Sequence, residues 1–176
     1  AKIKQGKLLH YFIIIGFLLF IPIYIYILKD LPSPTKLTSS NIPQSTQIFD
    51  RNGTLLYTIY NQKNQTFISL STIPKHVQKA TIAIEDKDFY RHGPIDLRGI
   101  TRSIYSIVFR QQLQGGSTLT QQLVKNSLLT PERTILRKIR EVLLSFATEI
   151  LYPKDKILEM YLNQIPYGGT SYGIEA

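Results

Sequence analysis

The sequence predicts a mainly α-helical domain with a small N-terminal β-hairpin, preceded by one transmembrane helix. Three observations support this class. A long apolar segment occupies residues 8–28, an Asn-Gly pair lies between two apolar runs in residues 47–57, and apolar residues recur at helical spacing through much of residues 74–165. With 176 residues, the chain can form one core of ordinary size, or a small domain with appendages.

The composition excludes several kinds of site. The chain has no cysteine, which rules out a disulfide framework and a thiolate zinc site. Its three histidines, His10, His76 and His92, are far apart in the sequence, so a histidine metal cluster is not expected. The formal net charge of +9 favours an anionic partner, which is a nucleic acid, an anionic lipid or a phosphorylated substrate.

The apolar segment predicts a membrane anchor. Residues 8–28 contain no Asp, Glu, Lys or Arg, and as a helix they would be roughly 30 Å long, enough to cross a bilayer. Lys2, Lys4 and Lys7 precede the segment, which places residues 1–7 in the cytoplasm and the rest of the chain outside it. A cleaved signal peptide would have an apolar region of about 7–15 residues and a small-residue cleavage site, which this sequence lacks. Nucleic acid is therefore not expected as a partner.

Two different segments follow the anchor. Residues 29–46 are rich in Pro, Ser and Thr without an apolar period, which predicts an extended juxtamembrane linker. Residues 47–57 place Asn52-Gly53 between two apolar runs, the pattern of a β-hairpin. We expect the folded domain to comprise residues 47–176.

The first predicted helix of the domain begins at Pro74 and ends near an acidic pair. One apolar face is formed by Val77, Ala80, Thr81 and Ile84. Glu85 falls on the flank of this face, where a carboxylate is partly desolvated and suited to proton transfer, whereas Asp86 points almost opposite. The alternative is that Glu85 is a helix-end acid in solvent, and the pattern by itself slightly favours that alternative.

A second amphipathic helix is predicted over residues 95–110. Its apolar residues are Leu97, Ile100, Ile104, Ile107 and Val108. Arg98 and Arg102 lie one turn apart on it, which alone indicates a solvated face.

A Gly115-Gly116 turn predicts the start of the next helix. Thr118 and Gln121 fit a capping box. A polar stripe opposite Leu119 and Leu123 consists of Thr118, Gln121, Gln122 and Lys125. This stripe is suited to a sugar and an anion, and the turn presents backbone N–H groups at a helix N-terminus, but the spacing is not that of a nucleotide P-loop. The pattern supports a functional and a structural role equally.

Two more helices are predicted after Thr130-Pro131-Glu132, a typical helix start. The first is expected to bury Ile135, Ile139, Val142, Leu143, Phe146 and Ile150. Its other face carries Arg137, Lys138 and Glu141, either as a surface ion pair or as a cationic patch able to hold a diphosphate. The second begins at Pro153 and ends before Pro166.

Four groups of residues then form a recognisable pattern. They are Glu85-Asp86 with Phe89 and His92; Gly115-Gly116-Ser117-Thr118 with Thr120, Gln121, Gln122, Lys125 and Asn126; Arg137-Lys138 with Glu141; and Ile157-Leu158-Glu159 with Tyr161, Leu162 and Asn163. In this order and spacing they resemble the peptidoglycan glycosyltransferase family. This is the transglycosylase domain of class A penicillin-binding proteins and of monofunctional cell-wall glycosyltransferases. The resemblance covers residues 45–176.

Two features depart from the family's pattern. The family usually has glycine two positions after the motif histidine, where this chain has Pro94, so the local loop is expected to differ. The chain stops at Ala176, before the family's fifth motif and any transpeptidase domain, so we expect an incomplete domain whose independent activity is in doubt.

The resemblance implies a lysozyme-like, mostly helical fold and polymerisation of lipid II into glycan strands. Glu85 would be the general base for the acceptor 4-hydroxyl, and Glu141 the second catalytic carboxylate, near the lipid diphosphate. The implied substrate-binding residues are Ser117, Thr118, Gln121, Gln122, Lys125, Asn126, Arg137 and Lys138, with Arg98 or Arg102 as further cations. The implied structural residues are Asp86, Phe89, His92, Gly115, Gly116, Glu159, Tyr161 and Asn163.

The resemblance also implies the setting of the reaction. The expected partners are lipid II, the growing glycan strand, the membrane and proteins of a cell-wall synthesis complex, with a divalent cation (Mg²⁺ or Mn²⁺) as a possible cofactor at the diphosphate. The expected location is the cytoplasmic membrane, with the catalytic domain on its outer side. Two alternatives are a membrane-anchored lysozyme-like glycan hydrolase, which would have less use for the basic residues, and a non-catalytic wall-binding protein, which would tolerate loss of Glu85.

Overall fold

The computed structural model describes residues 18, 21–22, 24–38, 45–60, 63–110 and 115–175. Its elements are η1 (Pro34–Thr38), β1 (Thr46–Phe49), β2 (Leu55–Ile59), β3 (Asn64–Gln65), α2 (Lys75–Glu85), α3 (Leu97–Arg110), α4 (Leu119–Leu128), α5 (Ile135–Leu151), α6 (Lys154–Gln164), β4 (Pro166–Gly168) and β5 (Ser171–Tyr172). The prediction of a mainly helical fold with a small hairpin is therefore confirmed.

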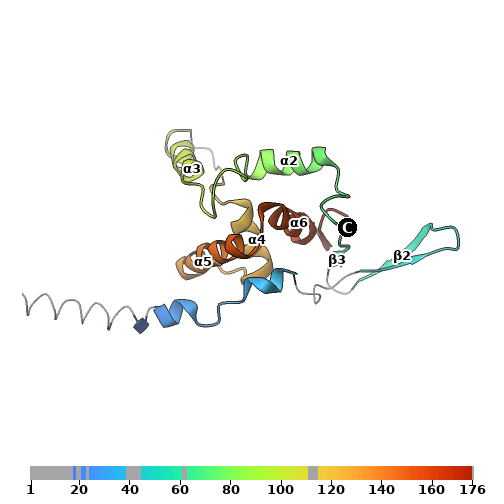
Figure 1. The fold of residues 1–176 in the computed structure, drawn as a ribbon, viewed down its shortest axis with the longest axis horizontal. Helices are drawn as coiled ribbons and strands as arrows, with labels where there is room; N and C mark the ends of the chain where they lie inside the picture. The colour runs from blue at the N-terminus through green and yellow to red at the C-terminus, as the bar shows by residue number, and fades with distance from the viewer. Residues whose placement is uncertain are drawn as a thin grey trace, which may run out of the picture.

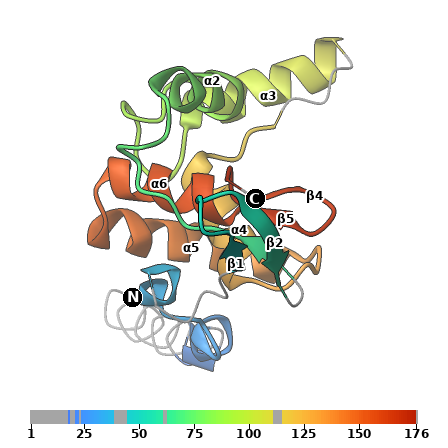
Figure 2. The same cartoon turned by 90° about the vertical axis from the view of Figure 1, so that its right-hand side faces the viewer.

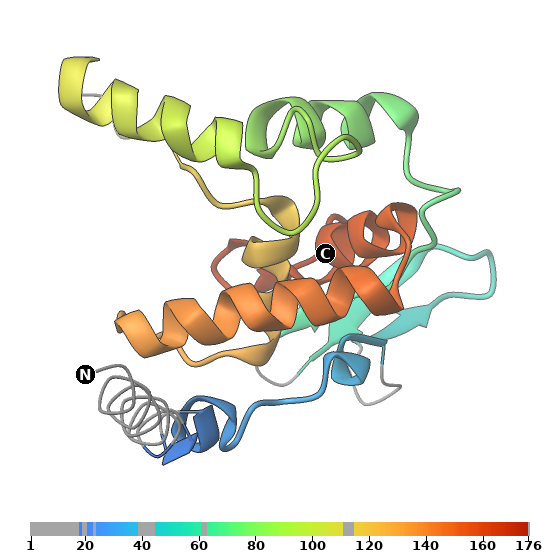
Figure 3. The same ribbon diagram turned by 60° about the vertical axis from the view of Figure 1, so that its left-hand side comes forward.

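Helix α4 lies at the centre of the core and packs against α5 and α6 (Figure 1). Its Leu119 and Leu123 are fully buried, and they join Ile157, Leu158 and Leu162 of α6 in one apolar cluster. Helices α2 and α3 form a separate layer on one side of α4–α6, as Figure 2 and Figure 3 both show. The end of α2 therefore meets the beginning of α4 between the two layers.

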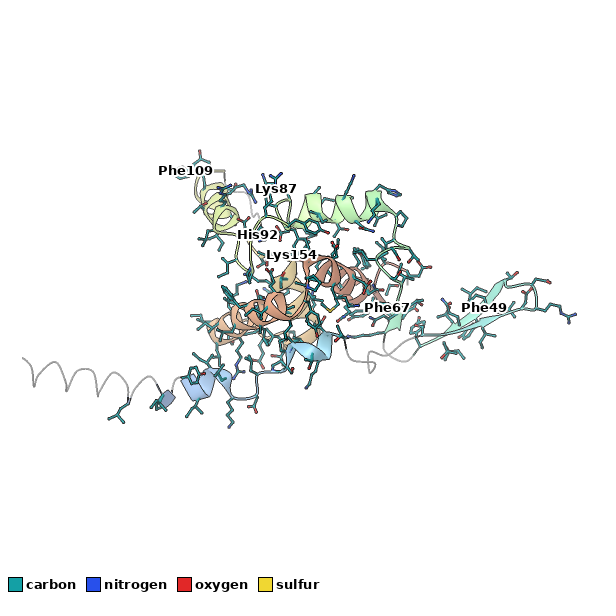
Figure 4. The ribbon with its side chains drawn as sticks, viewed as in Figure 1. Phe49, Phe67, Lys87, His92, Phe109 and Lys154 are labelled. Atoms are coloured by element: carbon teal, nitrogen blue, oxygen red, sulfur yellow. The ribbon has the colours of Figure 1, made fainter. Side chains whose placement is uncertain are left out.

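The predicted hairpin is present. Strands β1 and β2 pair antiparallel, with Ile48 opposite Tyr57. In the turn, the Asp50 carboxylate accepts hydrogen bonds of 2.8 Å from the backbone N–H groups of Asn52 and Thr54, while Gly53 adopts a φ of 82°. The hairpin extends away from the helices (Figure 1), and Phe49 lies far out on it (Figure 4). A second sheet, of order β3-β5-β4, was not predicted.

Part of the predicted extended linker is instead helical and packed. Within residues 29–38, η1 places the Leu37 side chain in the core with 1% of its surface exposed. Gln164 donates a hydrogen bond of 2.8 Å to the Leu37 carbonyl oxygen. A single leucine in a proline- and threonine-rich segment carries no period, which explains why the sequence pattern did not indicate this packing.

The predicted membrane span, residues 8–28, lies mostly outside the described residues, as does the predicted tail, residues 1–7. In the part of the chain that the structure describes, no helix is both long enough and apolar enough to cross a membrane.

Helix α5 differs from its prediction at its start and in its buried face. It begins at Ile135, because the Thr134 hydroxyl accepts a hydrogen bond from the Arg137 N–H and caps the helix. The buried residues are Glu141, Leu144, Ser145 and Thr148, whereas Ile135 and Ile150 of the predicted buried face are each 83% exposed. Of that predicted face, Ile139, Leu143 and Phe146 are also exposed. The predicted buried face was wrong because the ion pairs of Glu141 allow the polar side of α5 to face α4.

Next to Glu141, Arg140 ties α5 to the end of the N-terminal helix. Its guanidinium donates hydrogen bonds of 2.7–3.0 Å to the backbone carbonyl oxygens of Tyr26, Ile27 and Lys29. Carbonyl groups at a helix C-terminus lack partners within the helix, and a cation satisfies them well. Residues 24–38 therefore lie beside α5 in Figure 1 and Figure 3.

Candidate active site

Glu85 is the last residue of α2 and lies at the edge of a pocket. The pocket has a volume of about 320 Å³ and is lined by Glu85 of α2, by Asp86 directly after it, by Arg102 of α3 and by the Gly115–Thr118 segment. The Glu85 side chain is exposed, so the structure agrees with the interpretation that the pattern slightly favoured, a helix-end acid in solvent, and not with a partly desolvated carboxylate. Its carboxylate accepts a hydrogen bond of 2.9 Å from the Gln122 side-chain amide.

Asp86 joins the end of α2 to the start of α4. One carboxylate oxygen accepts a 3.0 Å hydrogen bond from the Leu119 backbone N–H, at the N-terminus of α4. The other lies 2.6 Å from Nε2 of His92. Figure 4 places His92 between the two helical layers, near Lys154. The Asp86 side chain is 4% exposed. Asp86, which was expected to be structural, is therefore a buried carboxylate that connects His92 to the start of α4, next to Glu85.

Burial of the His92 ring alone would lower its pKa. The hydrogen bonds to the Asp86 carboxylate and to the Gly93 carbonyl oxygen outweigh burial and raise the His92 pKa, although the Lys154 charge opposes them. When its ring is protonated, His92 neutralises the charge of the buried Asp86.

The start of α4 contains only half of the predicted capping box. The Thr118 hydroxyl accepts a hydrogen bond of 3.2 Å from the Gln121 N–H, as predicted. The Gln121 side chain, however, does not reach back to Thr118 and instead donates a 3.0 Å hydrogen bond to the Pro94 carbonyl oxygen. The Thr118 hydroxyl donates to the same oxygen at 3.1 Å. The Pro94 carbonyl oxygen thereby fixes its loop to α4.

Glu141 and Lys138 connect α5 to this region. Glu141 is 1% exposed and forms ion pairs with both Arg137 and Lys138, so the interpretation as a surface ion pair was wrong. The Lys138 ammonium also donates hydrogen bonds to the Ser117 hydroxyl at 3.2 Å and to Gln121 at 3.1 Å. One lysine therefore joins the buried carboxylate to the rim of the Glu85 pocket.

We call Arg137, Lys138 and Glu141 the basic cluster. A second pocket, of about 720 Å³, is lined in part by Arg137 and Lys138 of this cluster. Its basic and polar lining includes Lys125, Asn126, Arg133, Arg137 and Lys138. Arg137 and Lys138 thus belong both to the Glu141 ion pairs and to this basic pocket. Four of these five side chains were predicted for substrate binding, and Arg133 was not.

The two arginines of α3 separate. Arg102 lines the Glu85 pocket, whereas Arg98 lines another pocket beside His92. The sequence showed only that Arg98 and Arg102 lie one helical turn apart, and this spacing does not tell which of the two lies near Glu85.

The fourth group of motif residues holds α6 to the rest of the fold. The Asn163 side chain exchanges hydrogen bonds of 2.8–2.9 Å with the backbone of Ile68, and Glu159 accepts one of 2.9 Å from the Leu70 N–H. Phe89 is fully buried in the core. Tyr161 is 2% exposed, and its hydroxyl donates a hydrogen bond of 3.1 Å to Gln122, which in turn contacts Glu85.

Tyr167 is a residue near Glu85 that sequence reasoning missed. It lies in β4 and lines a pocket with Glu85 of α2 and Tyr161 of α6. Burial, followed by the Glu85 charge, raises the Tyr167 pKa. No local pattern marks this residue, because the β4-β5 pairing brings it toward α2.

The donor set does not fit a metal site built by the protein. Among the described residues, no group of three or more His, Asp or Glu side chains is placed to hold a metal ion. Both oxygens of Glu141 are engaged by Arg137 and Lys138.

Comparison with known proteins identifies related sequences. The sequence model of the Transglycosylase family matches residues 52–176. Penicillin-binding protein 1A of Aquifex aeolicus is 46% identical over 164 residues, which are 92% of this chain and 22% of that protein. Penicillin-binding protein 1F of Bacillus subtilis is 46% identical over 133 residues, 75% of this chain and 18% of that protein. Penicillin-binding protein 1A of Escherichia coli is 41% identical over 155 residues, 88% of this chain and 18% of that protein. The chain spans about a fifth of the length of these curated relatives.

Proposed function

Because the chain belongs to the transglycosylase family, we propose that the protein is a peptidoglycan glycosyltransferase that polymerises lipid II into glycan strands. The observation that carries the proposal is that the Gly115–Thr118 segment connects the exposed Glu85 carboxylate to the basic cluster. Glu85 lines the same pocket as Ser117, and Ser117 accepts a hydrogen bond from Lys138 of the basic cluster.

In this proposal Glu85 is the general base. It takes the proton from the acceptor sugar 4-hydroxyl while that oxygen attacks the donor anomeric carbon, and the bond to the lipid diphosphate breaks with inversion. Exposure at the mouth of a pocket is compatible with this role, because the acceptor hydroxyl must reach the carboxylate. The sugar itself would exclude water once bound.

The leaving diphosphate needs positive charge more than it needs an acid. Lys125, Arg137 and Lys138 line the basic pocket and supply that charge, and Asn126 adds hydrogen bonds. Glu141 acts by orienting Arg137 and Lys138, the two cations that it pairs with. Ser117 and Thr118 line the Glu85 pocket, Gln121 accepts a hydrogen bond from Lys138, and Gln122 donates one to Glu85.

The proposal includes a cellular setting. Residues 8–28 would anchor the protein in the cytoplasmic membrane, with residues 1–7 inside and the catalytic domain outside. A membrane lipid is then presented to an enzyme confined to the same surface. Arg140 supports this arrangement, because it fixes residues at the end of the predicted anchor to the helix that carries Glu141.

A lysozyme-like glycan hydrolase is the competing function. A hydrolase needs a glutamate in a cleft but has no diphosphate to bind, so the basic pocket favours the transferase. The two are separated by incubating the full-length protein with lipid II and analysing the products. Growing glycan strands and released undecaprenyl diphosphate are expected. Shortening of added glycan strands without any polymer would overturn the proposal.

The basic cluster has a test of its own. Lys138→Met is expected to raise the KM for lipid II about tenfold or more, because it removes one charge-assisted contact to the diphosphate. Lys79→Met, at an exposed lysine on α2, is the matched control and should leave the KM unchanged. An unaltered KM in Lys138→Met would place the diphosphate elsewhere.

A further inference from the structure

Three side chains from three helices form a line of hydrogen bonds that ends at Glu85. Tyr161 of α6 donates to the side-chain oxygen of Gln122 in α4 at 3.1 Å. The amide nitrogen of Gln122 donates to the Glu85 carboxylate of α2 at 2.9 Å. The line therefore runs from the core, where Tyr161 is 2% exposed, to the rim of the pocket.

The Glu85 carboxylate gives this line a direction, because it only accepts hydrogen bonds, so the Gln122 amide nitrogen faces Glu85 and the amide oxygen faces Tyr161. Burial, with a smaller contribution from the Glu85 charge, raises the pKa of the Tyr161 hydroxyl, so it remains protonated and can donate. A side-chain amide has one accepting end and one donating end. A reversed amide would set its oxygen against the carboxylate.

Glu85 needs such a restraint because its position leaves the side chain free. It is exposed at the end of α2, and it borders two pockets, one with Ser117 and the other with Tyr167. Asp86 fixes the backbone at this point but does not touch the Glu85 side chain. Within the described part of the chain, Gln122 provides the hydrogen bond that holds the Glu85 carboxylate.

We propose that Tyr161 and Gln122 are positioning residues for Glu85. Tyr161 holds the Gln122 amide in place by donating to its oxygen, and that amide holds the Glu85 carboxylate at the boundary of the two pockets, where an acceptor hydroxyl reaches it. This role differs from the substrate contact expected of Gln122 and from the purely structural role expected of Tyr161. It rests on the proposed function of Glu85 as the base.

The first test uses steady-state kinetics of the full-length protein with lipid II. Tyr161→Phe keeps the buried ring and removes only the hydroxyl, so kcat is expected to fall about tenfold, the effect of one disturbed hydrogen bond to a charged group. The KM should stay within about twofold of wild type. Gln122→Met keeps the length of the side chain without its amide and should lower kcat by more.

The double variant is the sharper measurement. If Tyr161 acts through Gln122, adding Tyr161→Phe to Gln122→Met causes no further loss of kcat. Losses that multiply would mean that the two residues act separately and would overturn the proposal. Should Tyr161→Phe fail to fold, Gln122→Met with an unchanged kcat would overturn it as well.

The pH profile of kcat distinguishes positioning from packing. A hydrogen bond donated to a carboxylate favours its charged form, so both single variants should move the acidic limb of the profile to higher pH. The charged and titratable groups that face Glu85 are Asp86, Lys87, Asp96 and Arg102 in one pocket and His76, Tyr161 and Tyr167 in the other. Both variants leave all of these except Tyr161 in place. An unmoved limb in both variants would overturn the proposal.

Two further variants separate this proposal from the proposed function. Tyr90→Phe removes an exposed hydroxyl that donates to Asp155 at 2.8 Å, and it should keep the wild-type kcat and pH profile. Glu85→Gln should lower the rate of polymerisation by about 10²-fold or more. If it does so while Tyr161→Phe and Gln122→Met retain wild-type kinetics, the positioning role is wrong and the proposed function stands. Undiminished polymerisation by Glu85→Gln would overturn both.

Discussion

Nε2 of His92 lies 2.6 Å from the Asp86 carboxylate, and Nδ1 of the same ring lies 2.6 Å from the Gly93 carbonyl oxygen. Both neighbours accept hydrogen bonds, so both ring nitrogens carry protons and the imidazole is positively charged. The same carboxylate accepts the Leu119 N–H. A charged histidine therefore completes the contact between the end of α2 and the start of α4, one residue from Glu85.

This contact predicts a pH dependence of stability. The pKa of His92 is raised in the folded protein, so its contribution to stability is complete below the unfolded pKa of about 6.5 and is lost as the pH rises through the folded value. We expect the Tm to fall by about 2–4 °C as the pH rises across that window. His92→Gln should remove this dependence, and His76→Gln, at an exposed histidine, should retain it. Identical Tm profiles in wild type and His92→Gln would contradict the assignment.

Glu141 predicts a loss of stability that is separate from catalysis. It is fully buried between Arg137 and Lys138, and Glu141→Gln leaves both cations without their counter-ion. Removing one partner of a buried ion pair costs about 3–5 kcal/mol, and the lower end applies because Lys138 is about half exposed. Chemical denaturation measures this cost. Glu132→Gln, at an exposed position before α5, is the control and should cost under about 0.5 kcal/mol. Equal costs would refute the structural role of Glu141.

Two glycines with nearly the same φ are expected to differ in how much stability a substitution by alanine removes. Gly173 and Gly53 have φ values of 81° and 82°, but a Cβ on Gly173 would lie 2.5 Å from the Asn163 carbonyl oxygen, whereas a Cβ on Gly53 meets nothing within 4 Å. Gly53→Ala should cost about 1–2 kcal/mol from the backbone conformation alone. Gly173→Ala should cost clearly more in the same denaturation experiment, because the clash is with backbone. If the two costs agree, the close packing of residues 173 and 163 is not real.

Local patterns predicted the parts of this fold that local chemistry decides. The Asn52-Gly53 turn and the α4 start at Thr118 were confirmed, because a turn residue and a cap act on their own neighbours. Leu37 was missed, since its burial depends on α4 and α5.

Local sequence patterns also failed to predict the buried face of α5 and the surroundings of Glu85. An apolar stripe usually faces the core, but on α5 the ion pairs of Glu141 make the opposite face the buried one. Similarly, the helical pattern placed Glu85 correctly at the end of α2 but gave no sign of its link to Tyr161. That link depends on how three helices meet.

The central claim is that Glu85 is the base of a glycan polymerisation, and one variant tests it directly. Glu85→Gln keeps the shape of the side chain and can still hydrogen-bond Gln122, but it cannot accept a proton at neutral pH. With lipid II and the full-length protein, the rate of glycan strand formation should fall by about 10²-fold or more at an unchanged Tm. Strand formation at the wild-type rate by Glu85→Gln would show that the base lies elsewhere.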